Sequence, residues 1–401
     1  MIFTSLFAAT LWATSLAAPT QSDSNVGSLV QRDADLDSLL LIVKAQDDVN
    51  DPDDLTVSAC LINTGKNTLK ILNDPNGPLT TWKTHTFEFY EVASSGTGLK
   101  ARSGGNAAHV SAVRVKYNPE VVAALADPST YTVLQPGENK TVTHDLSGMY
   151  TFQTSGPYAV KTTTNAENFR IIKDDGSIGI IPAKMYDGAE AANWTAVNVA
   201  ESGTYASLRG LVSAGIPTHL TRRWEEENSL IKRQTFRNCS ASQQKYIAEG
   251  VVGANAYIAE VNKYLATTYY LGNKRYRTWF GPYEKKRWNK VKSHYLALRN
   301  QPARFRYDCS CQEVDTFAYV YPDQFGTIYL CGAFWKAPVK GTDSKAGTII
   351  HEATHFTKLI GTDDYAYGHT DAMALAKSNP AQAIMNADSH EYFAENTPFI
   401  A

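Results

Sequence analysis

The chain has 401 residues, of which 43% are hydrophobic and 19% are charged, and its formal net charge is −2. This length suits two or three domains, and the apolar content is sufficient for packed cores. The nearly neutral charge argues against a nucleic-acid-binding protein. Beyond the first 18 residues, no apolar run is long enough to predict a membrane span of about 20 residues.

The first segment of the chain is uncharged and apolar. Residues 1–18 end in Ala17 and Ala18 before Pro19, which is typical of a secretory signal peptide, although the usual basic residues are missing. We expect cleavage after Ala17 or Ala18 and a secreted, extracellular protein. A membrane helix is the alternative, and the run is too short for a bilayer core of about 30 Å.

Residues 19–233 differ in pattern from residues 234–401. The first part contains short alternating runs separated by turn residues, at 55–62, 84–92, 156–162 and 168–172. This pattern predicts a small β-sandwich, and nothing in it assembles a catalytic constellation. It carries 19 basic and 25 acidic residues, against 19 and 15 in the second part. The opposite net charges favour docking of the two parts.

A dibasic pair, Lys232-Arg233, marks the boundary six residues before Cys239. In a secreted precursor this position favours proteolytic processing. Residues 19–233 are then an inhibitory and chaperoning pro-segment, and the mature protein begins near Gln234. The alternative is a functional β-module, such as a wall-binding domain, that is retained after secretion.

The second part is mainly helical in pattern. Helical spacing of apolar residues is seen at 240–270 and 282–299, and another helix is expected from Ser344, with Gly361 as its C-cap. Between them, 316–321 and 327–331 predict a β-hairpin. The expected fold is therefore α+β: a mainly helical domain at 234–401 with a small β-hairpin or sheet, preceded by the β-sandwich-like segment.

Four of the five cysteines lie in this second part, which implies two disulfides with three possible pairings. Cys309 and Cys311 are too close to bridge each other readily, so each is expected to pair with Cys239 or Cys331. A cysteine zinc site is disfavoured because the chain has no Cys-x-x-Cys pair and the compartment is oxidising.

The decisive motif is His351-Glu352-Ala353-Thr354-His355. Histidines four residues apart lie on one face of a helix, one turn apart, and can bind one zinc ion. Glu352 is offset by one residue and suits the general base for a zinc-activated water. An ordinary amphipathic helix is the alternative, but the flanking Ile349-Ile350 and Phe356 would bury the helix on both sides.

A third protein ligand is required, with the fourth position left for water. The metzincin pattern would place Gly at 358 and His at 361, where this chain has Lys358 and Gly361. Spacing alone leaves several downstream candidates open: Asp363, Asp364, His369, Asp388, His390 and Glu391.

The segment Gly361-Thr-Asp-Asp-Tyr-Ala-Tyr-Gly368 resembles the second signature of the aspzincins, which include deuterolysins and fungal peptidyl-Lys metalloendopeptidases. The resemblance extends through 235–401 and is nearest to the peptidyl-Lys branch, at 278–283, 317–322, 329–335 and 385–395. It implies a zincin-type catalytic domain with one zinc ion per chain. It further implies Asp364 as the third ligand, Tyr367 as a hydrogen-bond donor to the developing oxyanion, and disulfides Cys239–Cys309 and Cys311–Cys331.

Asp388 and Glu391 would lie one turn apart if their segment is helical, so both carboxylates could face one pocket. A lysine ammonium in a partly dry pocket needs such counter-charges, and the resemblance implies acidic residues here for cleavage on the amino side of lysine. The alternatives are that Asp388 only orients a zinc-bound histidine, that Glu391 is solvated, and that the enzyme is a general deuterolysin-like endopeptidase.

The sequence thus predicts a secreted, monomeric zinc metalloendopeptidase that acts on proteins or peptides and is inhibited by its own pro-segment. A non-catalytic zinc protein is disfavoured because a structural site needs four protein ligands and no base. The predicted hairpin could offer an edge to an extended substrate. Asn139, Asn193 and Asn238 lie in glycosylation sequons.

Overall fold

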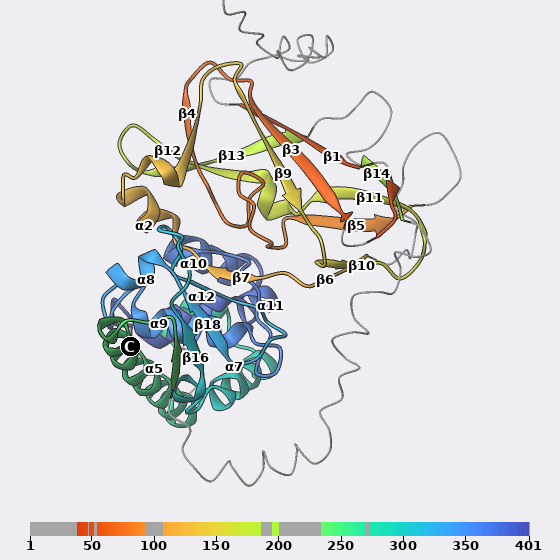
Figure 1. Cartoon of the computed structure of the whole chain (residues 1–401). Helices are drawn as coiled ribbons and strands as arrows, with labels where there is room; N and C mark the ends of the chain where they lie inside the picture. Colours follow the sequence, from red (N-terminus) through yellow and green to blue (C-terminus); the bar gives the residue numbers. More distant parts are fainter. Residues whose placement is uncertain are drawn as a thin grey trace, which may run out of the picture.

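The computed structural model describes residues 38–46, 48–51, 54–92, 107–185, 195–199, 234–268 and 273–400. The expected signal peptide and the Lys232-Arg233 pair lie outside these ranges. The described residues form a β-rich half followed in the chain by a mainly helical half (Figure 1). The α+β class expected from the sequence is therefore confirmed.

Two larger sheets build the β-rich half. The first has the described strand order β8 (Tyr131–Leu134), β4 (Leu69–Leu72), β12 (Asn168–Ile172), β13 (Ile178–Met185), β1 (Leu39–Ala45), β3 (Thr56–Asn63) and β9 (Asn139–Asp145). The second has the order β2 (Asp48–Val49), β14 (Thr195–Val199), β11 (Gly156–Thr162) and β5 (Phe87–Glu91). A small pair, β10 (Tyr150–Thr151) and β6 (His109–Val110), and helix α2 (Pro119–Ala124) complete it.

The two sheets share one hydrophobic core. Along β1 and β3, side chains at alternate positions are buried, as the period of two in a strand requires. Leu41 and Val57 from the first sheet and Phe89 and Tyr158 from the second belong to the same buried cluster. Burial of these apolar surfaces is the main stabilising contribution to this half.

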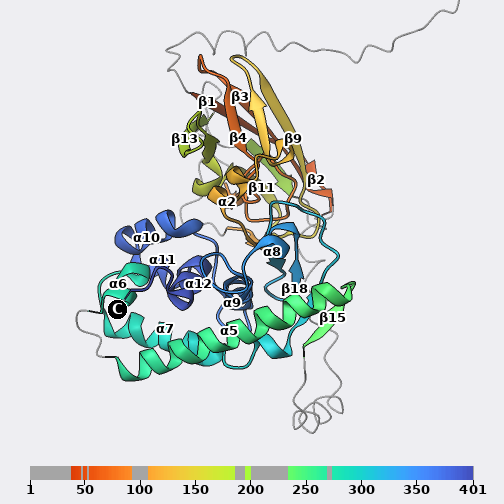
Figure 2. The same cartoon turned by 90° about the vertical axis from the view of Figure 1, so that its left-hand side faces the viewer.

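The helical half contains eight described helices around a small sheet. These are α5 (Ala241–Thr267), α6 (Lys274–Phe280), α7 (Lys285–Ala297), α8 (Gly332–Lys336), α9 (Lys345–His355), α10 (Gly368–Ser378), α11 (Pro380–Ala383) and α12 (Ala387–Glu395). The sheet has the order β15 (Thr235–Arg237), β16 (Arg306–Asp308), β18 (Thr327–Leu330), β17 (Ala318–Val320) and β7 (Arg114–Lys116). The long helix α5 runs along one side of this half (Figure 2). Among the described residues, no helix combines the length and apolar character needed to cross a membrane.

Several local predictions are confirmed. Strands β17 and β18 form the antiparallel hairpin that the sequence indicated. Helix α5 begins at a capping box in which Ser240 and Gln243 satisfy each other's backbone N–H groups. The two disulfides are Cys239–Cys309 and Cys311–Cys331, as the family resemblance implied.

Helix α9 begins where expected but ends earlier. The Ser344 side chain accepts a hydrogen bond from the Gly347 N–H, which caps the N-terminus. The predicted C-cap at Gly361 is wrong, because the helix ends at His355 and Phe356 already has an extended ψ of 120°. The Phe356 ring is buried in the core, and this burial directs the chain away from the axis of α9. Gly361, with φ 74°, instead closes the following turn by donating to the Thr354 and Phe356 carbonyls.

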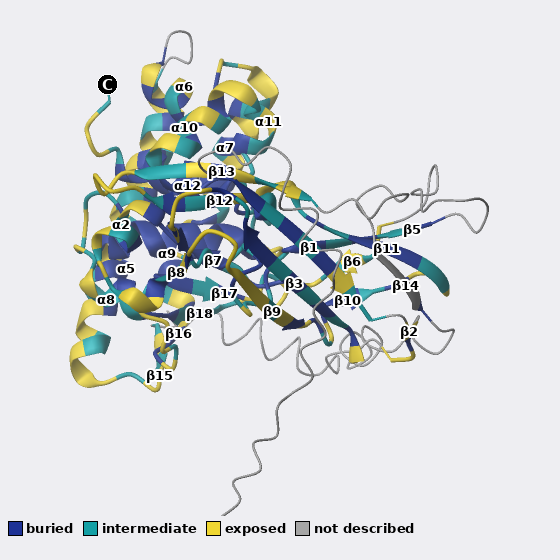
Figure 3. Ribbon diagram, turned by 90° about the horizontal axis from the view of Figure 1, so that it is seen from above, coloured by how far each residue is buried: buried dark blue, intermediate teal, exposed yellow. Residues whose placement is uncertain are grey.

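Every residue of α9 is buried, and this helix lies beneath the β-rich half (Figure 3). Strand β7 reaches it from the other half of the chain. It pairs antiparallel with β17, with Ala318 opposite Lys116, Tyr319 opposite Val115 and Val320 opposite Arg114. The edge of the β17–β18 hairpin that we expected to be available to a substrate is therefore occupied by a strand from the expected pro-segment.

Candidate active site

Helix α9 and the loop that follows it bring three possible metal ligands together. His351 Nε2 lies 3.0 Å from His355 Nε2. The Oδ1 atom of Asp364 lies 3.2 Å from the first nitrogen and 3.3 Å from the second. His351 and His355 are fully buried and Asp364 nearly so. The three side chains therefore direct their ligand atoms at a common point.

This cluster fits a zinc ion. Tetrahedral zinc with bonds of about 2.0–2.1 Å separates its ligand atoms by about 3.3 Å, close to the distances found here. The Nδ1 atom of His355 lies 3.0 Å from the Thr362 carbonyl, and that of His351 lies 2.8 Å from Asp388 Oδ1. Both acceptors favour a proton on Nδ1, which leaves each Nε2 lone pair free for a metal.

Glu352 points beside this cluster. Its Oε1 atom accepts a hydrogen bond of 3.1 Å from the Lys116 backbone N–H, and the side chain is fully buried. Burial raises the pKa of Glu352 well above its usual value. For Asp364 the effect of burial is outweighed by the neighbouring His355 and His351, which hold its pKa below the usual value.

Tyr367 contacts the same strand, β7, as Glu352. Its hydroxyl donates to the Val115 carbonyl oxygen at 2.8 Å and accepts from Asn76 Nδ2 at 2.6 Å. The ring is buried, and Tyr117 packs edge-on against it. The hydroxyl thus lies where it can donate to a backbone carbonyl beside the metal ligands.

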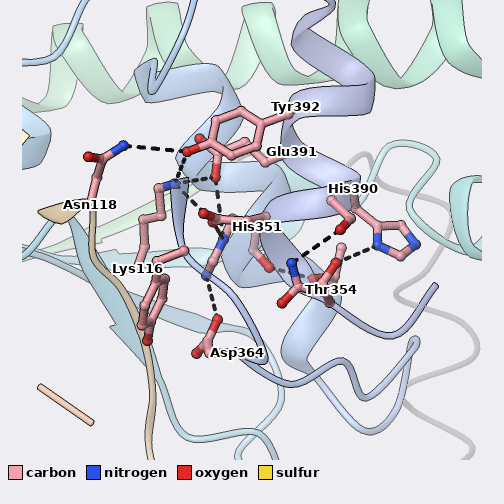
Figure 4. Close-up of polar contacts among 12 residues, drawn as sticks. Lys116, Asn118, His351, Thr354, Asp364, His390, Glu391 and Tyr392 are labelled. Carbon is pink, nitrogen blue, oxygen red and sulfur yellow. Dashed lines mark hydrogen bonds and ion pairs between the residues drawn. The ribbon is translucent and has the colours of Figure 1, made fainter. Parts of the chain in front are cut away.

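An acidic pocket, formed by Asp343, Asp388 and Glu391, adjoins His351. Asp388 and Glu391 lie one turn apart on α12 and are fully buried. Lys116 Nζ lies 2.9 Å from each of them and 3.2 Å from Asp343. Figure 4 shows the Lys116 side chain directed toward Glu391. Burial alone would lower the pKa of Lys116, but the carboxylates, Asp388 foremost, hold it well above its usual value.

Asp388 has three partners at once. Its Oδ1 atom contacts both Lys116 Nζ and His351 Nδ1, and its Oδ2 atom accepts from the Gly368 N–H at 2.7 Å. The two alternatives for Asp388, a counter-charge for lysine and an orienting partner for histidine, are therefore compatible. Glu391 is not solvated, since it is buried against the same ammonium.

Three of the other candidate ligands lie elsewhere, while Asp388 and Glu391 face the Nδ1 side of His351. Asp363 is half-buried and pairs with Arg114 at 2.8 Å. His369 packs against the Tyr392 ring, and His390 contacts His294. Among the described residues, Asp364 is the carboxylate that shares a ligand cluster with both His351 and His355.

Sequence reasoning missed Lys116, Asn118 and Asp343. Asn118 Nδ2 donates to Asp343 Oδ2 at 2.9 Å, and the Tyr392 hydroxyl donates to Asp343 Oδ1 at 2.7 Å. No spacing motif links Lys116 and Asn118 to α9, because strand pairing across the two halves brings them there, whereas Asp343 directly precedes the N-cap of α9. The one available signal was the alternation of Val113, Val115 and Tyr117 around Lys116, which indicates a strand.

A buried His-Glu-x-x-His helix joined by a downstream carboxylate, in an α+β fold, defines a metallopeptidase active centre. The family model described as lysine-specific metallo-endopeptidase matches residues 266–395. The chain belongs to this family, which uses zinc, and it is a zinc metalloendopeptidase.

Two similar sequences support this assignment along most of the chain. A peptidyl-Lys metalloendopeptidase of Armillaria mellea is 40% identical over 90% of this chain and 92% of its own length. An extracellular protease of Aeromonas hydrophila is 36% identical over 69% of this chain and 74% of its own length. A solved zinc peptidase structure from Grifola frondosa is 50% identical, with a TM-score of 0.40, and covers 41% of this chain and 100% of that chain.

Proposed function

We propose that this enzyme is a secreted zymogen that hydrolyses internal peptide bonds on the amino side of lysine. The observation that supports the lysine preference most directly is the acidic pocket. Two fully buried carboxylates, Asp388 and Glu391, each lie 2.9 Å from a lysine ammonium next to the ligand cluster. A buried ammonium without such partners would be strongly unfavourable.

We assign the metal to His351, His355 and Asp364. When bound, zinc supplies a Lewis acid that polarises a peptide carbonyl and activates water. The Thr362 carbonyl orients His355 by accepting from its Nδ1 atom, and the Asp388 carboxylate, 2.8 Å from the Nδ1 atom of His351, favours a proton on that nitrogen.

Glu352 acts as general base in this assignment. It takes a proton from the attacking water and passes it to the leaving nitrogen. Its contact with a backbone N–H at 3.1 Å agrees with the second task. Tyr367 donates to the carbonyl oxygen as negative charge develops there, a role supported by its 2.8 Å bond to a backbone carbonyl.

The residue after the scissile bond is selected by the acidic pocket. Asp343 is the most specific probe of this selection, because it contacts the lysine, and among the described residues its ion pairs and hydrogen bonds go to groups other than the proposed zinc ligands. Its backbone has φ 50°, a left-handed conformation that Asn adopts readily. Asp343→Asn therefore removes the charge without backbone strain.

The test is digestion of an unfolded protein mixture by the processed enzyme, with mass mapping of the new N-termini. Lysine should dominate the first position, and Asp343→Asn and Glu391→Gln should reduce that bias more than the overall rate. Asp323→Asn, on the surface of the same half, is the matched control. Absence of lysine enrichment with the wild type would leave a general deuterolysin-like endopeptidase as the better description.

The zymogen proposal rests on the apolar N-terminus and on Lys232-Arg233. We infer that residues 19–233, with their β-sandwich-like core, form the pro-segment, and that the mature monomeric enzyme spans 234–401. N-terminal sequencing of the secreted protein should give Gln234 or Thr235. A start well upstream of Lys232 would mean that the β-rich half is retained.

A further inference from the structure

The active-site edge of the catalytic sheet is covered by the chain's own strand β7. Besides the antiparallel register with β17, the Phe317 N–H donates to the Lys116 carbonyl at 3.0 Å. Pairing of an extended segment with a sheet edge is a common way for peptides to bind, since the backbone fixes the strand and pockets read alternate side chains. β7 thus has the backbone geometry of a bound peptide.

The peptide bond between Val115 and Lys116 lies between the two groups assigned to act on a substrate. On the nitrogen side, the Lys116 N–H donates to Glu352 Oε1 at 3.1 Å. On the carbonyl side, the Val115 oxygen accepts from the Tyr367 hydroxyl at 2.8 Å. The Val115 N–H also donates to Asp364 Oδ2 at 3.2 Å. The Val115–Lys116 peptide bond therefore contacts the proposed base and the proposed oxyanion donor, and the N–H of the preceding peptide group contacts a proposed zinc ligand.

The side chain that follows this bond is the one that the enzyme is proposed to select. Lys116 is fully buried, with its ammonium among the three carboxylates of the acidic pocket. Its Nζ atom also lies 4.9 Å from the centre of the Tyr392 ring, within range of a cation–π interaction. Lys116 thus has the position expected of a substrate lysine.

Two ion pairs outside the acidic pocket help to hold the β-rich half on the catalytic half. Arg114 pairs with Asp363 at 2.8 Å, immediately before the proposed ligand Asp364. Farther away, Arg170 of β12 pairs with Asp371 of α10 at 3.0 Å. These ion pairs link the β-rich half to the catalytic half outside the acidic pocket, and partly buried pairs of this kind add orientation to the docking.

We propose that the pro-segment inhibits the enzyme as a substrate mimic, in which β7 occupies the substrate-binding edge and Lys116 fills the lysine pocket. This inference rests on the proposed lysine preference. It identifies an inhibitory lysine within the chain, about 120 residues before the expected processing site. Substrates gain access only when β7 leaves the edge.

The test uses the full-length, zinc-loaded precursor with Lys232-Arg233→Ala-Ala to prevent processing. Initial rates are measured on a lysine-containing peptide for the parent, Lys116→Met and Arg114→Ala. Methionine keeps an apolar stem but cannot pair with the carboxylates, and Arg114 lies outside the pocket. The control is Lys70→Ala, because Lys70 is exposed on β4. Zinc content and melting temperature establish that each precursor is folded.

We expect Lys116→Met to raise kcat/KM of the precursor by at least about 10-fold, because a buried ion-pair partner is lost. Arg114→Ala should raise it less, and Lys70→Ala should leave it unchanged. If Lys116→Met does not fold, Arg114→Ala decides the question. Folded variants as inactive as the parent, or a parent as active as the processed enzyme, would overturn the proposal. Lysine preference is measured separately on the processed wild-type enzyme. A failure of the proposed lysine preference is therefore distinguished from a failure of the proposed inhibition.

Discussion

The Nζ atom of Lys116 lies 2.9 Å from the Oδ1 atom of Asp388, although 272 residues separate them in the chain. The same oxygen contacts the Nδ1 atom of His351 at 2.8 Å. Asp388 therefore connects the acidic pocket with the proposed zinc site. As a consequence, Asp388→Ala should weaken both lysine selection and zinc binding, and it cannot separate the two as Asp343→Asn can.

Asp364→Ala should abolish activity together with bound zinc. The carboxylate oxygen lies 3.2 and 3.3 Å from the two histidine nitrogens, so its removal leaves two protein ligands. Asp363→Ala is the matched control. Asp363 pairs with Arg114, so the variant protein should retain zinc. Metal analysis of the purified proteins checks both. Full zinc occupancy in Asp364→Ala would rule out this ligand assignment.

Glu352→Gln should retain zinc and lose nearly all turnover. Gln has almost the same shape but cannot take a proton from water, and general-base catalysis contributes about 10²–10⁴-fold. Glu313→Gln, at an exposed position in the same half, serves as control. Substantial residual kcat in Glu352→Gln with normal zinc content would contradict the assigned role.

Tyr367→Phe should lower kcat by about 100-fold with little change in KM, since it removes one donor to the developing oxyanion. The neighbouring Tyr365 is half-buried and close to Tyr367 in the chain. Tyr365→Phe is therefore the comparison. An increase in KM at constant kcat would instead indicate a role for Tyr367 in ground-state binding.

The zinc-loaded precursor should slowly cut its own Val115–Lys116 bond. This bond contacts Glu352 and Tyr367 as a substrate bond would. Intact-mass analysis and N-terminal sequencing should detect a fragment that begins at Lys116, and Glu352→Gln should abolish it. If the bond stays intact while the enzyme becomes fully active, the strand is removed without cleavage at this bond and this prediction is wrong.

A buried histidine pair should make the catalytic half sensitive to acid. Burial lowers the pKa of His390 to about 4, and burial together with His390 lowers the pKa of His294 to about 2. The Nδ1 atom of His294 lies 2.9 Å from the Nε2 atom of His390, with Lys290 as a nearby charge. Both are neutral in the folded state, whereas the unfolded chain takes up protons below pH 6.5. The stability that they contribute is therefore present above pH 6.5 and is lost as the pH falls toward 4.

His294→Gln tests this dependence, because Gln can still donate to His390 but does not titrate. The free energy of unfolding should fall less steeply with decreasing pH, by up to about 1.4 kcal/mol per pH unit. Denaturant titrations between pH 4 and 7 measure the difference. Parallel curves for the two proteins would show that His294 does not contribute.

The sequence by itself determined the features that depend on local geometry. A helix places residues four apart on one face, so His351, His355 and the adjacent Glu352 could be assigned from spacing. The same rule brought Asp388 and Glu391 together once their segment was taken as helical. The Gly361 C-cap was wrong because burial of Phe356, a tertiary effect, ends the helix first.

The tertiary structure alone decided which distant groups meet. Spacing left six carboxylates and histidines open as the third ligand, and chain packing brings Asp364 to the two imidazoles. Asp343, which itself has a left-handed backbone conformation, lies directly ahead of α9 and contributes a carboxylate to the acidic pocket. Lys116 enters the pocket on a strand from the other half of the chain. Strand pairing between distant segments depends on complementary edges and on burial across the interface, neither of which a local pattern encodes.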